Sequence, residues 1–427
     1  MISTKDNLDR ALVVGVAFKN DEREGIDEFL DELILLADTA GAKVVQRVFQ
    51  ERQSPDPAFF IGKGKAEEVK RICDNENINF VIFDDDLSGV QIRNLEGVIE
   101  RRVLDRSGLI LEIFGLRART REAKLQVEMA QLKYNMSRLS GRWQHFSKQY
   151  GVIGTRGPGE KQIEVDRRVI KKRISSLRQK LDAISSQREL RRRRRSDVPK
   201  FALVGYTNAG KSTLMNALSG AETFVENRLF TTLDAFTRKA FLSPSIPCLL
   251  VDTVGFIRKL PPDLIASFKS TLEEVAFADY ILHIVDVSNS RFREQIEIVD
   301  ETLTQLGCAT KPRVLVFNKV DRVLGFGIVR SVLHEYDGSS VAISAERHIN
   351  LGQLKDKMIK LMGADVIVKS FNIKPAQSEK LAKIMSVAEF IQESEHSVED
   401  PAGGNSLHLK VRMRKKDWEK LKKEIHT

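Results

Sequence analysis

The chain has 427 residues, of which 42% are hydrophobic, so it is long enough for two to four packed domains. Its net charge is +10, but residues 1–105 contain 14 Lys and Arg against 22 Asp and Glu, whereas the remainder contains 55 against 37. This basic excess favours a polyanionic partner, nucleic acid first, over a merely soluble surface. No apolar run approaches the roughly 18 residues of a membrane span, and Cys73, Cys248 and Cys308 are too scattered for a zinc site or disulfide framework. We therefore expect a cytoplasmic protein with no stable membrane insertion. We also expect it to be monomeric.

Residues 1–106 alternate strand and helix signals. Strands are predicted at residues 11–18, 43–49, 80–83 and 102–104, and helices at 26–40, 65–77 and 88–98. This alternation predicts a small α/β domain with a largely parallel sheet. Gly62-Lys63-Gly64-Lys65 opens a helix there, and a phosphate site and a plain turn are equally good interpretations of it. Asp84-Asp85-Asp86 ends a strand, and we interpret this run as a solvated turn in preference to a metal site.

Residues 107–196 show the spacing of paired helices. Apolar side chains recur at intervals of four and three residues in two runs, Leu125, Met129, Leu132, Met136, Leu139 and Trp143, and then Ile170, Ile174, Leu177, Leu181 and Ile184. The glycine-rich segment 151–159 separates these runs and cannot continue a helix. The pattern therefore predicts a long antiparallel helical hairpin whose tip is residues 151–159.

The second predicted helix is strongly basic. Residues 161–195 contain 14 Lys and Arg against four acidic residues, and they end in Arg191, Arg192, Arg193, Arg194 and Arg195. We interpret the five arginines as contacts to an RNA phosphate backbone, in preference to a solvated linker. In the tip, Arg156 is the charged residue before Glu160, and it either probes RNA or belongs to a simple connecting loop.

Residues 197–362 and 363–427 form two further predicted domains. In the first, strand signals at 200–205, 237–242, 248–253, 280–286, 313–318 and 340–345 have helix signals between most of them, which predicts a doubly wound α/β domain. In the second, a strand at 366–373, a helix at 376–393, a strand at 407–413 and a basic helix at 415–424 predict a small α/β domain.

The strongest motif is Gly205-Tyr206-Thr207-Asn208-Ala209-Gly210-Lys211-Ser212. It fits G-x-x-x-x-G-K-[ST] and lies between a predicted buried strand and a predicted helix, which is the context of a P-loop. Backbone N–H groups of such a loop and the helix dipole hold phosphates. We expect Lys211 to reach the terminal phosphates as a catalytic group, Ser212 to bind Mg²⁺, and Asn208, Gly210 and Thr213 to complete the cradle.

Three further motifs follow the ends of the third, fifth and sixth predicted strands of this domain. Asp252-Thr253-Val254-Gly255 supplies a carboxylate for Mg²⁺ and the Gly255 N–H for a γ-phosphate. Asn318-Lys319-Val320-Asp321 supplies a carboxylate that accepts two hydrogen bonds from guanine, which adenine cannot donate. Ser344-Ala345-Glu346 brings the Ala345 N–H towards the guanine O6. Together the motifs predict a GTP site whose base-side residues are Asn318, Lys319, Asp321, Ser344 and Ala345.

The segment Leu229-Phe230-Thr231-Thr232-Leu233-Asp234 lies between the P-loop and Asp252. A threonine in this region can complete the Mg²⁺ shell and contact the γ-phosphate. We expect Thr232 to do so, in preference to Thr231. The segment would order with the triphosphate and relax after hydrolysis.

These motifs resemble those of one family. The P-loop with Asn208, the segment 230–234 and the segment 252–258 look like those of the HflX GTPases, which are ribosome-associated members of the translation-factor-related GTPases. Segments 60–65, 105–111 and 154–160 also resemble that family, so the likeness covers nearly the whole chain and is weakest over the last 65 residues.

The resemblance implies several expectations about function. It implies binding to the large ribosomal subunit and its rRNA, and splitting or rescue of stalled ribosomes under stress. It implies that the tip with Arg156 approaches the peptidyl-transferase region. It further implies that Asn208 helps to hold K⁺ near the phosphates, and that the N-terminal half binds ATP, for which residues 1–105 indicate no place.

Phe256 departs from the pattern of Ras-like GTPases. It follows Gly255, where many GTPases have a glutamine that orients the attacking water. A phenylalanine ring has no donor or acceptor for that task. We therefore expect slow hydrolysis of GTP to GDP and phosphate by the isolated protein, and stimulation by a partner such as the ribosome.

Other classes of GTPase are alternatives. Relatives that modify tRNA have a C-terminal catalytic cysteine, whereas this sequence ends Glu424-Ile425-His426-Thr427. A ribosome-assembly factor with a KH domain needs a G-x-x-G loop, which the sequence lacks after residue 363. The basic helix 161–195 and the lack of a lipidation motif count against a membrane-associated switch. The leading prediction is a GTPase directed at ribosomal RNA, and the alternative is an RNA-binding regulatory GTPase that acts in ribosome assembly or signals through a protein partner.

Overall fold

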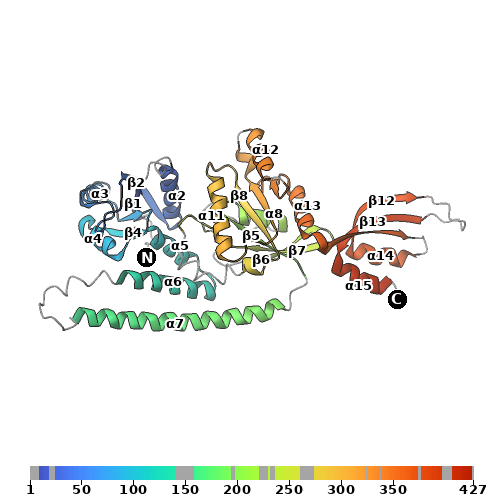
Figure 1. Cartoon of the computed structure of the whole chain (residues 1–427), viewed down its shortest axis with the longest axis horizontal. Helices are drawn as coiled ribbons and strands as arrows, with labels where there is room; N and C mark the ends of the chain where they lie inside the picture. Colours follow the sequence, from blue (N-terminus) through green and yellow to red (C-terminus); the bar gives the residue numbers. More distant parts are fainter. Residues whose placement is uncertain are drawn as a thin grey trace. The chain divides into compact units, whose positions relative to one another are not determined.

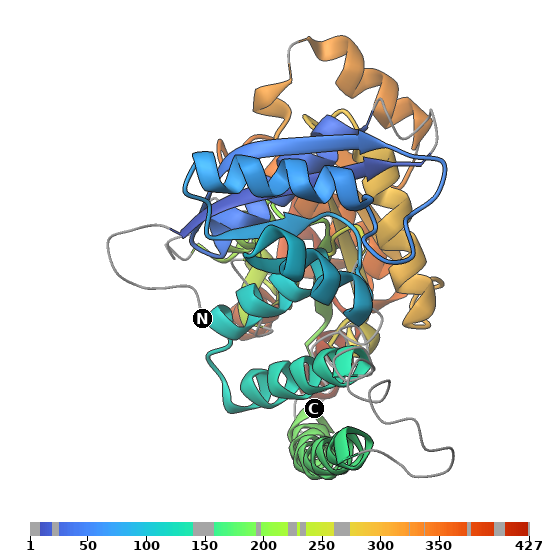
Figure 2. The same cartoon turned by 90° about the vertical axis from the view of Figure 1, so that its left-hand side faces the viewer.

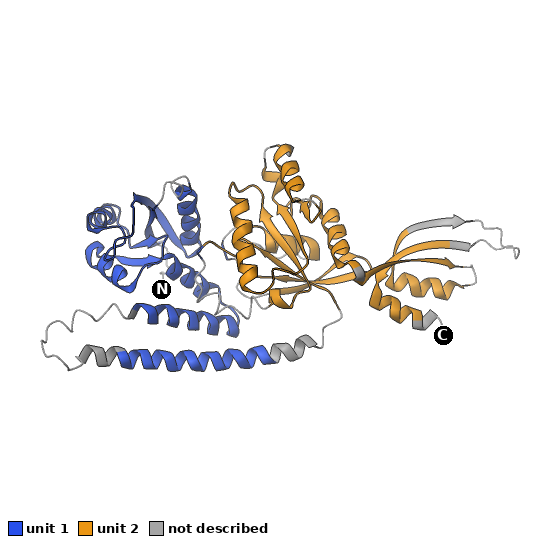
Figure 3. Cartoon of the chain, in the orientation of Figure 1, with its two compact units in different colours: residues 1–193, 226–234, 259–271 blue, residues 194–225, 235–258, 272–427 orange. Residues whose placement is uncertain are grey.

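The computed structural model describes residues 9–18, 25–139, 158–193, 198–220, 229–230, 236–259, 274–323, 325–336, 338–373, 377–396 and 406–425. The chain forms two compact units (Figure 3). Unit 1 consists of residues 1–193 together with the short segments 226–234 and 259–271, and unit 2 contains the rest of the chain. None of the described helices is long and apolar enough to cross a membrane.

Unit 1 contains a four-stranded parallel sheet. Its strands are β1 (Asp9–Ala17), β2 (Ala42–Glu51), β3 (Phe80–Phe83) and β4 (Arg102–Asp105), in the order β2-β1-β3-β4. All three pairings are parallel, so the predicted parallel α/β domain is confirmed. β3 is buried along its whole length, which explains its unbroken apolar sequence Phe80-Val81-Ile82-Phe83.

Four helices accompany this sheet: α2 (Ile26–Thr39), α3 (Lys63–Asn75), α4 (Gly89–Ile99) and α5 (Arg106–Arg117). Local chemistry fixes where two of them begin. Ser88 and Gln91 form a reciprocal capping box at the start of α4. The Asp105 carboxylate accepts the Gly108 N–H at 2.8 Å and caps α5, in which Leu109, Ile110, Leu111, Ile113 and Phe114 are buried.

Helices α6 (Arg121–Leu139) and α7 (Pro158–Arg193) lie side by side (Figures 1 and 2). Leu177 of the predicted seam is fully buried, and Arg173 on α7 forms an ion pair with Glu128 on α6. Tyr134 on α6 donates a hydrogen bond to the Asp105 carboxylate at 2.7 Å, which anchors α6 to the sheet domain. The predicted tip, residues 151–159, extends too far, because helix α7 already begins at Pro158. Proline is accepted at the first helical position because its missing N–H would have no partner within the helix. Segment 151–157 and Trp143 lie outside the described residues.

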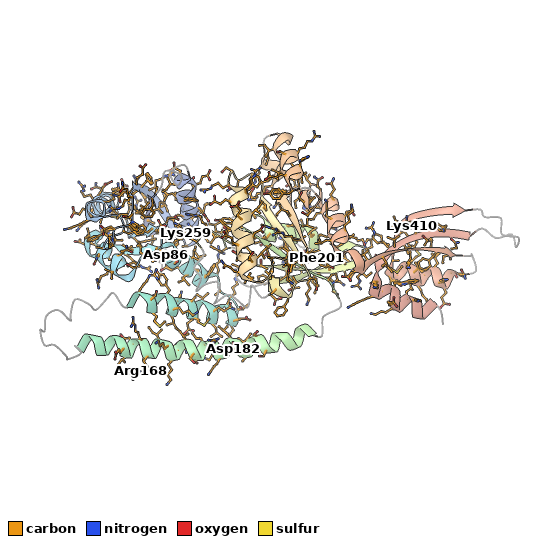
Figure 4. The ribbon with its side chains drawn as sticks, in the orientation of Figure 1. Asp86, Arg168, Asp182, Phe201, Lys259 and Lys410 are labelled. Carbon is orange, nitrogen blue, oxygen red and sulfur yellow. The ribbon has the colours of Figure 1, made fainter. Side chains whose placement is uncertain are left out.

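The acidic run Asp84-Asp85-Asp86 is only in part the solvated turn that we expected, because Asp86 is exposed but Asp84 is not. Asp84 is buried and pairs with the guanidinium of Arg106 at 2.6 Å. Lys259, from one of the short segments of unit 1, lies beside the run and pairs with Asp84 at 3.4 Å and with Asp85 (Figure 4). Sequence spacing could not predict this, because the two cations come from positions 22 and 175 residues away from Asp84.

The other short segment of unit 1 contains Leu229 and Phe230. The Leu229 N–H donates to the Thr39 hydroxyl at 3.2 Å, and the Phe230 ring contacts the Phe114 ring edge-on with centroids 4.8 Å apart. Both residues are buried. The start of the predicted γ-phosphate-sensing segment is therefore packed against α2 and α5, whereas Thr231 and Thr232 lie outside the described residues.

Unit 2 contains a six-stranded sheet in the order β10-β9-β8-β5-β7-β6. The strands are β5 (Lys200–Gly205), β6 (Phe236–Ser243), β7 (Ile246–Asp252), β8 (Tyr280–Asp286), β9 (Arg313–Asn318) and β10 (Ser340–Ala342). β6 is antiparallel to β7, and every other pairing is parallel. This arrangement confirms the predicted P-loop α/β domain. Its helices are α8 (Lys211–Ser219), α11 (Phe292–Gln305), α12 (Phe326–Glu335) and α13 (Leu351–Met362), with the single turns η2 (Val320–Arg322) and η3 (Gly363–Asp365).

The C-terminal part of unit 2 has a three-stranded antiparallel sheet in the order β11-β13-β12. Its elements are β11 (Val366–Ile373), α14 (Ser378–Val387), β12 (Glu389–His396), β13 (Ser406–Arg414) and α15 (Lys415–Ile425). The predicted helix 376–393 is wrong in its second half, because the chain becomes extended at Ala388 and β12 pairs with β13. A register shift between Phe390 and Gln392 breaks the alternation by which a strand is recognised in sequence.

Candidate functional site

The P-loop connects the buried strand β5 to helix α8. Asn208 and Gly210 have φ angles of 60° and 94°, and these left-handed residues turn the chain from strand to helix. A Cβ atom on Gly210 would lie 2.2 Å from the Asn318 side-chain nitrogen, so glycine is required there. Gly210 caps α8 without a side-chain hydrogen bond. In a P-loop the N–H groups at the start of this helix hold an anion, and the motif predicts the same for α8.

Lys211 lies at the centre of the loop and is almost fully buried. Its Nζ donates to the carbonyl oxygens of Gly205 at 3.1 Å and Tyr206 at 2.8 Å. Burial lowers the pKa of Lys211 to about 8, and the Asp252 carboxylate opposes this shift. The amine is thus held by two neutral carbonyls, and a phosphate would be a stronger partner for the ammonium ion.

Ser212 and Asp252 come together as predicted. The Ser212 hydroxyl donates to the Asp252 carboxylate at 2.7 Å, where β7 ends beside the start of α8. A hydroxyl and a carboxylate oxygen at this spacing are hard ligands of the kind that Mg²⁺ takes together with phosphate oxygens. The donor set therefore fits the ion, while Thr232, the third predicted ligand, lies outside the described residues.

The segment after Asp252 runs along the P-loop. The Phe256 N–H donates to Gly205 O at 3.1 Å, and the Thr207 N–H donates to Phe256 O at 2.7 Å. A Cβ atom on Gly255 would lie 2.9 Å from Thr207 and 3.1 Å from Lys211 Nζ, so the Gly255 backbone approaches the predicted phosphate position closely. The Phe256 ring is buried, which removes it from the place of a water-orienting side chain.

Asn318 ties the base side of the site to the P-loop. Its amide nitrogen donates to Ala209 O at 2.9 Å, and its amide oxygen accepts the Ala345 N–H at 2.9 Å. Both groups of the side chain are thus used inside the protein, and so is the Ala345 N–H that we expected at the guanine O6. We interpret Asn318 as a brace that fixes the Ala345 loop.

The remaining base-side residues follow β9 and β10. Lys319 has a left-handed φ of 64°, and its ammonium pairs with Asp286 at 2.6 Å. Asp321 lies on η2 with its side chain exposed. The buried Ser344 hydroxyl accepts the Arg347 N–H at 3.0 Å. Our sequence reasoning missed Asp286, although it ends the strand next to the one that leads to Lys319.

The predicted nucleotide-binding residues that the structure describes lie in unit 2, and the described RNA-binding candidates lie in unit 1. The P-loop, Asp252, Gly255, Asn318 and Ala345 lie together at the carboxyl ends of adjacent parallel strands in unit 2. Asn208 has an exposed side chain and Thr213 lies in the first turn of α8. Arg191, Arg192 and Arg193 end helix α7 in unit 1, while Arg156, Arg194 and Arg195 lie outside the described residues.

Three sequence families match consecutive parts of the chain. Residues 27–115 match the family described as GTP-binding GTPase N-terminal, and residues 117–195 match GTP-binding GTPase Middle Region. Residues 200–319 match the family described as 50S ribosome-binding GTPase.

Individual proteins match over most of their length. GTPase HflX of Escherichia coli (strain K12) is 38% identical over 426 residues, which are 99% of this chain and 98% of the relative. GTPase HflX of Flavobacterium psychrophilum is 47% identical over 315 residues, 74% of this chain and 76% of the relative. A GTP-binding protein from Sulfolobus solfataricus, solved with GDP, is 27% identical with a TM-score of 0.45 and covers 82% of this chain and 98% of its own. The chain therefore belongs to the HflX family of GTPases. It binds GTP and hydrolyses it to GDP and phosphate.

Proposed function

We propose that the protein acts as a cytoplasmic monomer on the large ribosomal subunit, where it splits or rescues stalled ribosomes under stress. The observation that supports this most directly is the basic outer face of α7, in a chain whose GTPase domain matches a family described as 50S ribosome-binding. A ribosome presents a dense array of RNA phosphates, and an exposed row of cations is the chemical complement of such a surface.

Helix α7 has a packed apolar seam and many exposed basic residues, and Val165 and Val169 are exposed as well. The seam residues Ile170, Ile174, Leu177, Leu181 and Ile184 are buried or partly buried. The exposed basic side chains on the rest of the helix are those of Arg167, Arg168, Lys171, Lys172, Arg178 and Lys180, whereas Arg173 pairs with Glu128 on α6. Because the helix has 36 residues, it extends over about 54 Å, which is long enough to follow several phosphates of an RNA strand.

We further assign RNA contacts to residues at both ends of this helix. These are Arg156, which precedes the helix in sequence, Arg191, Arg192 and Arg193 at its end, and Arg194 and Arg195, which follow in sequence. Guanidinium groups bind phosphate oxygens in a bidentate manner and stack on bases, which suits them to structured rRNA.

The nucleotide would act in this function as GTP with Mg²⁺. Ser212, Asp252 and Thr232 would hold the ion, which neutralises charge on the β- and γ-phosphates during hydrolysis. Lys211 and the Gly255 N–H would hold the γ-phosphate, Asp321 would select guanine, and Asn208 would help to hold K⁺. Phe256 cannot orient the attacking water, so the ribosome would complete the site and accelerate turnover.

The first experiment measures GTP turnover by the purified protein as large subunits are added, with small subunits as the comparison. We expect a steep rise with large subunits only. A flat response would contradict action on the large subunit and would favour the alternative, a regulatory GTPase that acts in ribosome assembly or signals through a protein partner. Splitting is measured separately, as the release of free subunits from intact ribosomes with a non-hydrolysable GTP analogue and with GDP.

A charge-matched pair of variants tests the role of α7. In the first, Arg168, Lys171 and Arg178 are replaced by glutamine. In the control, Lys43, Lys63 and Arg71, which are exposed in the acidic sheet domain, are replaced in the same way. The α7 variant should bind large subunits more weakly. Its negative slope of log affinity against log salt should become shallower by about 2 to 3. Equal slopes of log affinity against log salt for the two variants would show that α7 does not contact the RNA.

A further inference from the structure

Thr207, the third residue of the P-loop motif, has a buried hydroxyl without a partner. The residue is 7% exposed, and among the described residues its Oγ1 makes no hydrogen bond. A buried hydroxyl that is left unpaired costs stability, so such groups are rare in folded proteins and call for a reason.

The other hydroxyls of this region provide a contrast. The Ser212 hydroxyl donates to Asp252 at 2.7 Å, and the Thr253 hydroxyl donates to Leu203 O at 2.7 Å. Both are accounted for by contacts within the protein. Thr207 is the exception among these three, although it lies in the same loop as Lys211.

The surroundings of Thr207 place it at the terminal-phosphate end of the site. A Cβ atom built on Gly255 would be 2.9 Å from Thr207 Cγ2 and 3.1 Å from Lys211 Nζ, so these two side chains approach the same point. Lys211 is the residue that reaches the β- and γ-phosphates in P-loops, and the N–H of a glycine such as Gly255 meets the γ-phosphate.

The methyl group and the backbone of Thr207 are fixed. Its Cγ2 faces the Gly255 backbone, and its N–H donates to Phe256 O at 2.7 Å. A β-branched side chain has few rotamers, so packing of the methyl group also restricts the hydroxyl. The hydroxyl is therefore pre-oriented and free to donate, which is the arrangement that a ligand oxygen can use without a cost of reorganisation.

We propose that the Thr207 hydroxyl donates a hydrogen bond to the γ-phosphate of bound GTP. GDP lacks that phosphate, so the contact distinguishes the triphosphate from the diphosphate. It adds a polar group to the γ-phosphate side of a site in which Phe256 contributes none. The proposal depends on the GTPase activity and not on ribosome binding.

The test compares the affinities of Thr207→Val and Thr207→Ser for GDP and for guanosine 5′-(β,γ-imido)triphosphate by titration calorimetry. Valine keeps the shape and removes the hydroxyl, whereas serine keeps the hydroxyl. We expect Thr207→Val to lose about tenfold or more in affinity for the triphosphate analogue, as for a hydrogen bond to a charged group, and to bind GDP within about twofold of wild type. Thr207→Ser should remain close to wild type for both ligands.

The control is Thr302→Val, which removes a buried hydroxyl that donates to Ile298 O in α11. It should leave the ratio of the two affinities unchanged. An equal loss of both affinities in Thr207→Val would show a structural role and overturn the proposal. So would unchanged affinities, or a Thr207→Ser variant that behaves like Thr207→Val.

Discussion

His283 should make the stability of the GTPase domain depend on pH. It lies in the middle of β8, fully buried, and among the described residues neither ring nitrogen makes a hydrogen bond. Burial lowers its pKa to about 4, Asp300 opposes the shift, and the positive charges of Arg313 and Lys211 add to it. Asp300 lies 3.6 Å from the ring but is already paired with Arg313.

The magnitude follows from the two pKa values. In the unfolded chain the ring titrates near 6.5, so between about pH 6.5 and pH 4 the unfolded state binds more protons than the native state. The free energy of unfolding therefore falls as pH is lowered through this window. On going from pH 8 to pH 5 the loss from His283 alone is about 2 kcal/mol, and it approaches about 3.4 kcal/mol below pH 4.

The assay compares wild type with His283→Leu, which is close in volume and cannot be protonated. The free energy of unfolding is measured in urea at pH 8, 6.5 and 5. Pulsed hydrogen exchange of peptides from β5, β8 and β9 is the probe, so the measurement reports this domain alone. We expect wild type to lose about 2 kcal/mol more than the variant between pH 8 and pH 5. Parallel pH profiles would refute the reasoning, because every other titrating group is common to both proteins.

Three further predictions concern the nucleotide site. Asn318→Ala leaves the Ala209 carbonyl and the Ala345 N–H without partners, so the same urea assay should show a loss of about 2 to 4 kcal/mol; an unchanged midpoint would contradict its role as a brace. Lys211→Ala should weaken GDP and GTP binding by about 10- to 100-fold in titration calorimetry, and wild-type affinity would exclude a phosphate contact. Asp321→Asn should shift preference from GTP towards xanthosine triphosphate, and unchanged selectivity in a competition assay would exclude base reading by Asp321.

Local patterns predicted most of the two sheet domains correctly. The strand Phe80–Phe83 and the strand before the P-loop are short apolar runs bounded by turn residues, and such runs form buried parallel strands wherever helices cover both faces. The P-loop could be placed because its function requires particular residues at fixed spacing, and Gly210 shows why: any side chain there would collide with Asn318.

The errors arose where a distant partner decides the conformation. Glu389–His396 contains few apolar residues and a register shift, so it becomes a strand only through pairing with β13. Asp84 looked like a solvated turn residue because neither Arg106 nor Lys259 is close to it in sequence. Sequence reasoning placed Asn318 at the base, and only the folded loop revealed that its amide is used by Ala209 and Ala345.

The sequence by itself determined that this protein is a P-loop GTPase with a parallel α/β domain before it and a basic helix between them, because periodicity and motif spacing are properties of adjacent residues. The tertiary structure decided which distant residues pack together and which polar groups are buried. It packed Leu229 and Phe230, which begin the predicted γ-phosphate-sensing segment, and Lys259 with the N-terminal sheet domain in one compact unit. It also buried the Thr207 hydroxyl without a partner beside Lys211 and Gly255. Contacts of this kind join residues that are distant in the chain, and their energies depend on burial and geometry, which no local pattern specifies.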